Sequence, residues 1–326
     1  MKYFYNFTLV ILFFGNFLLQ AQAQAQEKDQ KRKSSLKLSS LSGDNSFKSY
    51  TFNGALGINS DWKLTTSYYY ADSGQAQNTT EQLISHEFRM GGDVLFLNSW
   101  NAYGELILRE DPYSLYGKGG AIGLSYDLSD LWKGRKLTRL SLSFQRINYN
   151  QEVTLTGNRA SLNIQRSITQ SKRSFGLDQE LFSWLLFQLQ LSRYKYDEST
   201  NKLGLATANR RTTWAGSQSP SYGLPDTSTS LSLVFSPWDW GETILYRDMT
   251  TFLTTEESKS TSWTLEQIFF YRSWEWGGSI TKVEFSDANS TSTSTSTSTS
   301  TSTSTSTSTS DDSKQTFYAV QIGYQW

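Results

Sequence analysis

Apolar and polar residues alternate one by one along most of this chain of 326 residues. The last segment shows the pattern most clearly, because Tyr318, Val320, Ile322, Tyr324 and Trp326 alternate with small or amide residues. Successive side chains of a β-strand point to opposite faces, so a period of two predicts strands with one apolar face. A helix would repeat its apolar residues every three or four positions. The pattern therefore favours an all-β fold.

About fourteen segments of this kind follow one another, with roughly twelve to sixteen possible. We expect strands at 34–42, 47–58, 62–71, 81–96, 100–110, 115–128, 137–149, 152–166, 182–197, 227–237, 240–252, 259–271, 274–286 and 315–326. The connection over 167–181 is longer than expected for the end of the strands at which it lies. Otherwise, mostly short connections such as 59–61 and 272–273 alternate with longer polar ones at 72–80, 198–226, 253–258 and 287–314. An even number of strands puts both ends of the region on the short-turn side.

The first residues have the features of an export signal. Lys2 is followed by an apolar run to Leu19 and by small residues at Ala21, Ala23 and Ala25. A basic start, an apolar stretch and an A-x-A site predict a secretory signal peptide over 1–25, and an uncleaved signal anchor is the alternative. The charged residues 26–33 then predict a solvated periplasmic linker rather than a binding patch.

Composition narrows the class of exported protein. The 30 basic and 30 acidic residues balance, which gives no electrostatic case for nucleic-acid binding. There is no cysteine, and no later window is long and apolar enough for a transmembrane helix. Aromatic residues make up 15% of the chain, although its mean hydropathy is −0.50. Strands that alternate between lipid and a polar interior have this combination.

The aromatic residues gather at the two ends of the expected strands. Tryptophans lie at or next to the short-turn ends, at Trp62, Trp100, Trp132, Trp184, Trp238, Trp240, Trp274, Trp276 and Trp326. Tyrosines such as Tyr68, Tyr116 and Tyr194 lie at the opposite ends. Amphipathic rings favour the membrane–water interface, so two belts of this kind predict a barrel that spans a bilayer.

With a signal at 1–25, alternating strands from 34 to 326 and this final strand, the chain resembles the Gram-negative outer-membrane β-barrel proteins as a class. The resemblance implies a transmembrane, antiparallel, up-and-down barrel in the outer membrane, with short periplasmic turns and longer outer loops. Its final strand is similar to the signal read by the barrel-assembly machinery, through Tyr318, Val320, Ile322, Tyr324 and Trp326, although members usually end in Phe. We expect outer-membrane lipids and that machinery as partners, and a monomer.

Several charged residues share the inward parity of the expected strands. They are Lys63, Glu87, Arg89, Asp93, Glu105, Arg109, Arg139, Arg159 and Glu266. So many charges are too costly for a dry core, so they predict either a wet lumen or a network of ion pairs. The first hypothesis is a porin-like channel for passive diffusion of small polar solutes or ions through a mixed-charge lumen. The alternative is a structural or adhesive barrel that acts through its outer loops and whose charges close the lumen.

An unbroken alternation of Ser and Thr fills 290–310, inside the longest expected loop, 287–314. Such a tract cannot bury apolar surface, so we expect a flexible outer loop. It could be a glycosylated or displayed loop, or a tolerated repeat expansion.

No residue pattern predicts an enzyme, a cofactor site or a metal site. The only histidine, His86, shares the parity of Ile84, Phe88 and Met90, so we expect it on the lipid side near the outer rim. Glycines over 117–120 lack the spacing of a phosphate-binding loop and lie in an expected strand, where glycine marks a bend or a close backbone approach.

Overall fold

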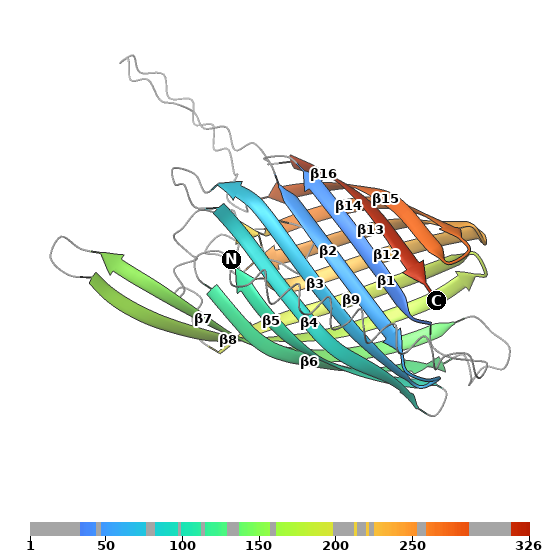
Figure 1. Cartoon of the computed structure of the whole chain (residues 1–326), viewed down its shortest axis with the longest axis horizontal. Coiled ribbons are helices and arrows are strands. Elements are labelled where there is room, and N and C mark those ends of the chain that lie inside the picture. The colour runs from blue at the N-terminus through green and yellow to red at the C-terminus, as the bar shows by residue number, and fades with distance from the viewer. Residues whose placement is uncertain are drawn as a thin grey trace, which may run out of the picture.

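The strands of this protein close into a single antiparallel barrel (Figure 1). The computed structural model describes residues 33–43, 47–75, 82–96, 99–111, 115–128, 137–156, 161–197, 212–213, 220–221, 225–252, 259–286 and 314–326. Each barrel strand pairs with its neighbours in the sequence, and β1 pairs with β16 to close the ring. The fold is therefore an up-and-down barrel of 14 strands, and both the fold class and the strand count expected from the sequence are confirmed.

The bounds of the elements are as follows. The barrel strands are β1 (Ser35–Gly43), β2 (Lys48–Gly57), β3 (Trp62–Gln75), β4 (Gln82–Phe96), β5 (Trp100–Asp111), β6 (Leu115–Asp127), β7 (Thr138–Thr156), β8 (Ser161–Phe182), β9 (Leu185–Tyr196), β12 (Pro225–Trp238), β13 (Gly241–Phe252), β14 (Lys259–Tyr271), β15 (Trp274–Ser286) and β16 (Lys314–Gln325). A separate two-stranded sheet consists of β10 (Thr212–Thr213) and β11 (Pro220–Ser221).

One part of the expected segmentation is wrong. The sequence predicted a strand at 152–166 and a long connection over 167–181, but β8 runs without interruption from Ser161 to Phe182. It pairs with β7, and both strands extend past the rest of the barrel at the left of Figure 1. The alternation is hidden in this stretch because polar residues occupy both faces, as Ser171, Lys172 and Arg173 show. The chain then turns back at 183–184 into β9.

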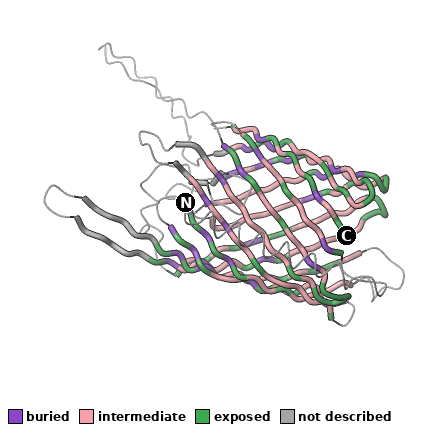
Figure 2. The backbone as a smooth tube through the Cα atoms, in the orientation of Figure 1, coloured by how far each residue is buried: buried purple, intermediate pink, exposed green. Residues whose placement is uncertain are grey.

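The two faces of the barrel wall differ in chemistry. Along each strand, side chains alternate between an exterior and an interior face. In parts of the barrel, Figure 2 shows exposed residues alternating with more buried ones. Large apolar side chains such as Leu142 and Val320, which are 62% and 66% exposed, lie on one face. Ile147 and Phe317, which are almost fully buried, lie on the other. We call the first the outer face and the second the inner face.

The short turns explain how neighbouring strands are joined. At the turn after β2, the Oδ1 atom of Asn59 accepts hydrogen bonds from the backbone nitrogens of Asp61 and Trp62, at 2.8 and 2.7 Å. Such side-chain bonds favour a tight reversal. At the two-residue turn between β14 and β15, Arg272 takes a left-handed backbone conformation with φ 55°, as primed hairpin turns require.

Aromatic rings line the short-turn end of the barrel. Trp238 stacks on Trp240, with centroids 5.2 Å apart, and Trp240 stacks on Phe269 at 6.0 Å. Further along the rim, Trp274 contacts Tyr324 at 4.9 Å. That these rings sit at a membrane interface stays a prediction, and Trp132 of the expected belt lies outside the described residues.

The described residues contain no helix long and apolar enough to cross a membrane. The expected signal peptide at 1–25, almost all of the linker at 26–33, and 287–313 of the Ser/Thr loop lie outside the described part of the chain.

Candidate lumen-lining site

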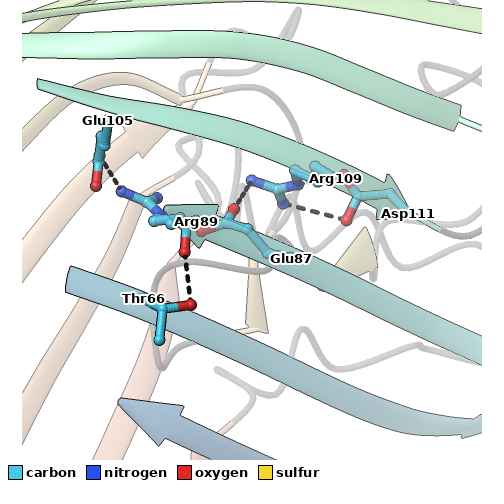
Figure 3. Close-up of polar contacts among 6 residues, drawn as sticks. All are labelled: Thr66, Glu87, Arg89, Glu105, Arg109 and Asp111. Carbon is cyan, nitrogen blue, oxygen red and sulfur yellow. Dashed lines mark hydrogen bonds and ion pairs between the residues drawn. The ribbon is translucent and has the colours of Figure 1, made fainter. Parts of the chain in front are cut away.

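Five charged side chains form a continuous ladder on the inner face of β4 and β5 (Figure 3). From the long-loop end towards the middle of the barrel, the order is Asp111, Arg109, Glu87, Arg89 and Glu105. Residues two apart on a strand share a face, and Glu87 and Arg109 are direct partners in the β4–β5 register. The period of two therefore brings all five charges to one face.

The ladder is held by charge-assisted hydrogen bonds. Arg109 donates to both carboxylate oxygens of Asp111, at 2.5 and 3.2 Å, and to Oε2 of Glu87 at 3.4 Å. Arg89 donates from Nε to Oε1 of Glu87 at 2.5 Å and from Nη1 to Oε1 of Glu105 at 2.9 Å. Acid and base alternate, so each guanidinium has a carboxylate on either side.

Burial differs along the ladder. The side chains of Arg109 and Asp111 are each 6% exposed and that of Glu87 is 4% exposed, whereas Arg89 and Glu105 are 29% and 21% exposed. A buried charge is tolerated only when it is paired and hydrogen-bonded, as these are. The end of the ladder at Asp111, Arg109 and Glu87 is thus a buried network, whereas Arg89 and Glu105 at the other end are more accessible to solvent.

Apolar residues flank the buried end of the ladder. On one side lies the inner-face cluster of Ile107, Leu115, Ala121, Ile147, Tyr149 and Ile168. On the other lies the cluster of Leu41, Phe47, Ala71, Val283 and Phe317. These clusters exclude water from the buried ion pairs and strengthen them.

Glycines on the inner face of β6 make room for neighbouring aromatic rings. A Cβ atom at Gly117 would lie 2.8 Å from the ring of Tyr149, and one at Gly123 would overlap the ring of Tyr103. Gly119 approaches the carbonyl oxygen of Arg146 so closely that a Cβ would stand 2.0 Å from it. Gly119 is thus a close backbone approach, one of the two alternatives that the sequence left open for the glycines of 117–120.

A second part of the inner face, from β8 through β15, is lined by hydroxyl and amide groups. The hydroxyls of Ser174 and Ser192 are 2.9 Å apart, and those of Thr264 and Thr281 are 2.8 Å apart. Gln188 accepts a hydrogen bond from Ser232 and donates one to Asp178. Neighbouring strands are thus joined by uncharged polar pairs that can also bind water or a polar solute.

A third part is acidic. Glu242, Asp248, Glu266 and Glu275 lie on the inner face of β13, β14 and β15. Lys37 on β1 pairs with Glu275 at 2.7 Å, and Gln321 donates to Glu266 at 2.7 Å. The other two carboxylates face no basic partner in the strand register, so this wall carries net negative charge.

The structure brings some of the expected lumen residues together and leaves others apart. Glu87, Arg89, Glu105 and Arg109 form the ladder. Lys63 and Asp93 are register partners on β3 and β4. Arg139 faces Asp127 and Asp178 across β6 and β8, and Glu266 belongs to the acidic wall. Arg159 lies outside the described residues.

Sequence reasoning missed Asp111, Lys37, Glu242, Asp248 and Glu275. Asp111 stood at a strand end, one residue beyond the expected boundary. The register of β13 and β15 could not be fixed because both of their faces are mixed in polarity. The tryptophans could have revealed the inward position of Glu275. Trp274 and Trp276 lie on the outer face, so alternation places Glu275 between them on the inner face.

The remaining expected residues lie on the outer face or at its rim. Tyr318, Val320 and Ile322 of the final strand are exposed there. His86 lies on the face opposite Glu87, where its Nδ1 atom is 2.8 Å from the hydroxyl of Tyr68. Within the part of the chain that the structure describes, no group of three or more histidine or acidic residues could hold a metal ion.

The connection between β9 and β12 reaches over to β4. Its short strand β10 pairs with β11 and contacts β4, from which β9 is separated around the barrel by β8, β7, β6 and β5. The connection therefore comes close to the strand that carries Glu87 and Arg89.

Known structures share this architecture. The CymD monoaromatic hydrocarbon channel is similar with a TM-score of 0.55 at 8% sequence identity, covering 92% of this chain and 89% of that one. The toluene transporter TodX of Pseudomonas putida has a TM-score of 0.45 at 10% identity, with 91% and 90% covered. The KdgM porin has a TM-score of 0.40 at 6% identity, with 90% and 99% covered. No family model and no curated protein matches the chain. At 8% identity, the likeness to the CymD channel establishes the barrel fold alone.

Proposed function

We propose that this protein is a passive, porin-like channel of the outer membrane, through which small polar solutes or ions diffuse. In this proposal residues 1–25 are the signal peptide, 26–33 a periplasmic linker and 34–326 the barrel. The final strand guides assembly by the barrel-assembly machinery, the barrel is a monomer among outer-membrane lipids, and it has no enzymatic activity.

The observation that carries the proposal is that the described ion pairs on the inner face run along the wall. Glu87 on β4 pairs with Arg109 on the adjacent strand β5. Lys37 on β1 pairs with Glu275 on β15, and only β16 lies between these two strands. Charges that closed the lumen would instead pair across it. Lateral pairs do not bridge the lumen, and this favours a channel over a barrel closed by its own charges.

The charged side chains of the inner face give it a net negative charge. Its carboxylates include Glu87, Asp93, Glu105, Asp111, Asp178, Glu242, Asp248, Glu266 and Glu275, whereas its described bases are Lys37, Lys63, Arg89, Arg109, Arg139 and Lys172. An excess of fixed negative charge raises the local concentration of cations and excludes anions. We therefore expect permeant cations to be preferred over anions.

The connection between β9 and β12 would set the width of the bore in this proposal. Its short strand β10 contacts β4, and we expect the connection to narrow the passage on that side of the barrel.

Deletion of 290–310 separates the channel from an adhesive barrel. The Ser/Thr tract connects β15 to β16 and belongs to no described strand. Single-channel conductance in a planar bilayer should be the same for the deletion and the intact chain. A deletion that folds but loses conductance would overturn the proposal that the barrel wall forms the channel.

A further inference from the structure

The outer face of β6, β7, β8 and β9 changes abruptly along the strands from apolar to basic. Nearer the short turns, one row of register partners across these strands is Leu124, Leu142, Phe175 and Leu191, all of them exposed. Nearer the long loops, the outer face of each of these strands carries an exposed cation instead of an apolar residue. We call these five residues the basic patch: Lys118, Arg146, Arg173, Arg193 and Lys195.

The centre of the basic patch is a pair of facing arginines. Arg173 of β8 and Arg193 of β9 are direct partners in the register, and both are exposed on the outer face. Like charges directly opposite one another destabilise a sheet. Two residues along β8 from Arg173, Ser171 stands between Arg146 and Lys195, which adds two more cations near the pair.

The patch lacks its own anions. Among the described side chains on the outer face of these four strands, the acidic one is Asp197, which lies at the long-loop end and accepts a hydrogen bond from the backbone nitrogen of Thr169. Among the described residues, no ion pair involves a member of the basic patch. Two outer-face cations elsewhere have partners of their own, since Arg247 lies over the ring of Trp263 at 4.8 Å and Lys282 pairs with Glu284 at 3.6 Å.

We infer that the basic patch binds the phosphate group of an anionic lipid in the membrane leaflet on the long-loop side. Guanidinium groups are suited to phosphate because they donate two parallel hydrogen bonds. A cluster of Lys and Arg directly beside an apolar membrane surface attracts anionic headgroups.

The position of the patch argues for a lipid rather than a free anion. Phe144 is the register partner of Arg173, and Phe175 and Leu191 are the next outward residues on β8 and β9 towards the short turns. A phosphate held by Arg173 and Arg193 would therefore place its acyl chains along this exposed apolar surface. Burial of acyl chains adds to the affinity, which a free phosphate cannot gain.

The test compares lipid retention in detergent micelles by native mass spectrometry. The full chain is titrated with phosphatidylglycerol or with phosphatidylcholine of the same acyl chains. The variant is Arg173→Gln with Arg193→Gln, and the matched control is Lys282→Gln with Lys314→Gln, which removes two exposed charges from the opposite part of the wall. At about 1 kcal/mol for each cation, retention of phosphatidylglycerol should fall about thirtyfold in the variant and stay unchanged in the control.

A second variant and a competitor keep the result interpretable. Arg173→Lys with Arg193→Lys keeps the charge and loses the paired donors, so it should retain phosphatidylglycerol at a level between the wild type and the glutamine variant. Excess inorganic phosphate should not displace the lipid. The inference is overturned if the wild type holds both lipids equally, if the control loses as much as the variant, or if inorganic phosphate alone competes the lipid away.

Discussion

Arg89 and Glu105 form an ion pair of 2.9 Å that joins β4 to β5 at the solvent-accessible end of the inner-face ladder. Substitution Arg89→Gln would leave the carboxylates of Glu87 and Glu105 without this cation and raise the negative charge at the bore. We expect the reversal potential under a salt gradient to shift towards cations. Arg173→Gln, which removes an arginine from the outer face, should leave the reversal potential as it is in the wild type. An equal shift in both variants would contradict the placement of the ladder at the bore.

The buried end of the ladder should matter for stability rather than for selectivity. Arg109→Met would leave Asp111 as an uncompensated buried charge and would remove one of the two cations that pair with Glu87, which costs about 3–5 kcal/mol. Urea unfolding in lipid vesicles measures this loss. Arg89→Met is the control, because its side chain is 29% exposed rather than 6%, and water can compensate part of the lost pairing. Similar losses in the two variants would refute the difference in burial.

These two predictions could be only partly drawn from the sequence. Glu87, Arg89, Glu105 and Arg109 share a parity on strands whose opposite face is strongly apolar, so the ladder could be assigned to one face. Their order and pairing follow from the register of β4 against β5, which places Glu87 opposite Arg109. Nothing in a single sequence fixes that register, because a slip of two residues keeps every side chain on its face.

The segment over 167–181 shows where the alternation fails as a signal. Lys172 and Asp178 face inward, but Ser171 and Arg173 also break the apolar outer face, so both faces are polar. Polar residues also occupy both faces of β13, where Thr243 and Arg247 face outward. For this reason the inward positions of Glu242 and Asp248 could not be predicted from the alternation. A barrel strand loses its apolar outer face where it leaves the hydrocarbon or binds a polar group, and there only pairing with its neighbours reveals it.

Gly119→Ala should destabilise the barrel. Its Cβ would lie 2.0 Å from the carbonyl oxygen of Arg146, so β6 and β7 would have to separate. Overpacking of this kind costs about 1–3 kcal/mol. Gly104→Ala is the matched control, since the nearest atom to its Cβ would be 3.9 Å away. Urea unfolding of both variants checks this, and equal stabilities would show that the close approach is not rigid.

The acidic wall should set the sign of selectivity. Neutralising it with Glu242→Gln and Glu275→Gln would remove two inner-face carboxylates and leave Lys37 without its partner. We expect the preference for cations to decrease, measured as a reversal potential closer to zero. Glu284→Gln removes an outer-face carboxylate and should have no effect. If the double variant kept the full cation preference, the wall would not face the conducting path.

Single-channel recording of the wild-type protein in a planar bilayer tests the central claim most directly. The mature chain, shown by circular dichroism to be folded in the same lipid, should give discrete current steps, and a salt gradient should reveal a preference for cations over anions. A folded and inserted protein that conducts no current would contradict the channel. Steps that favour anions would contradict the assignment of the acidic wall to its lumen.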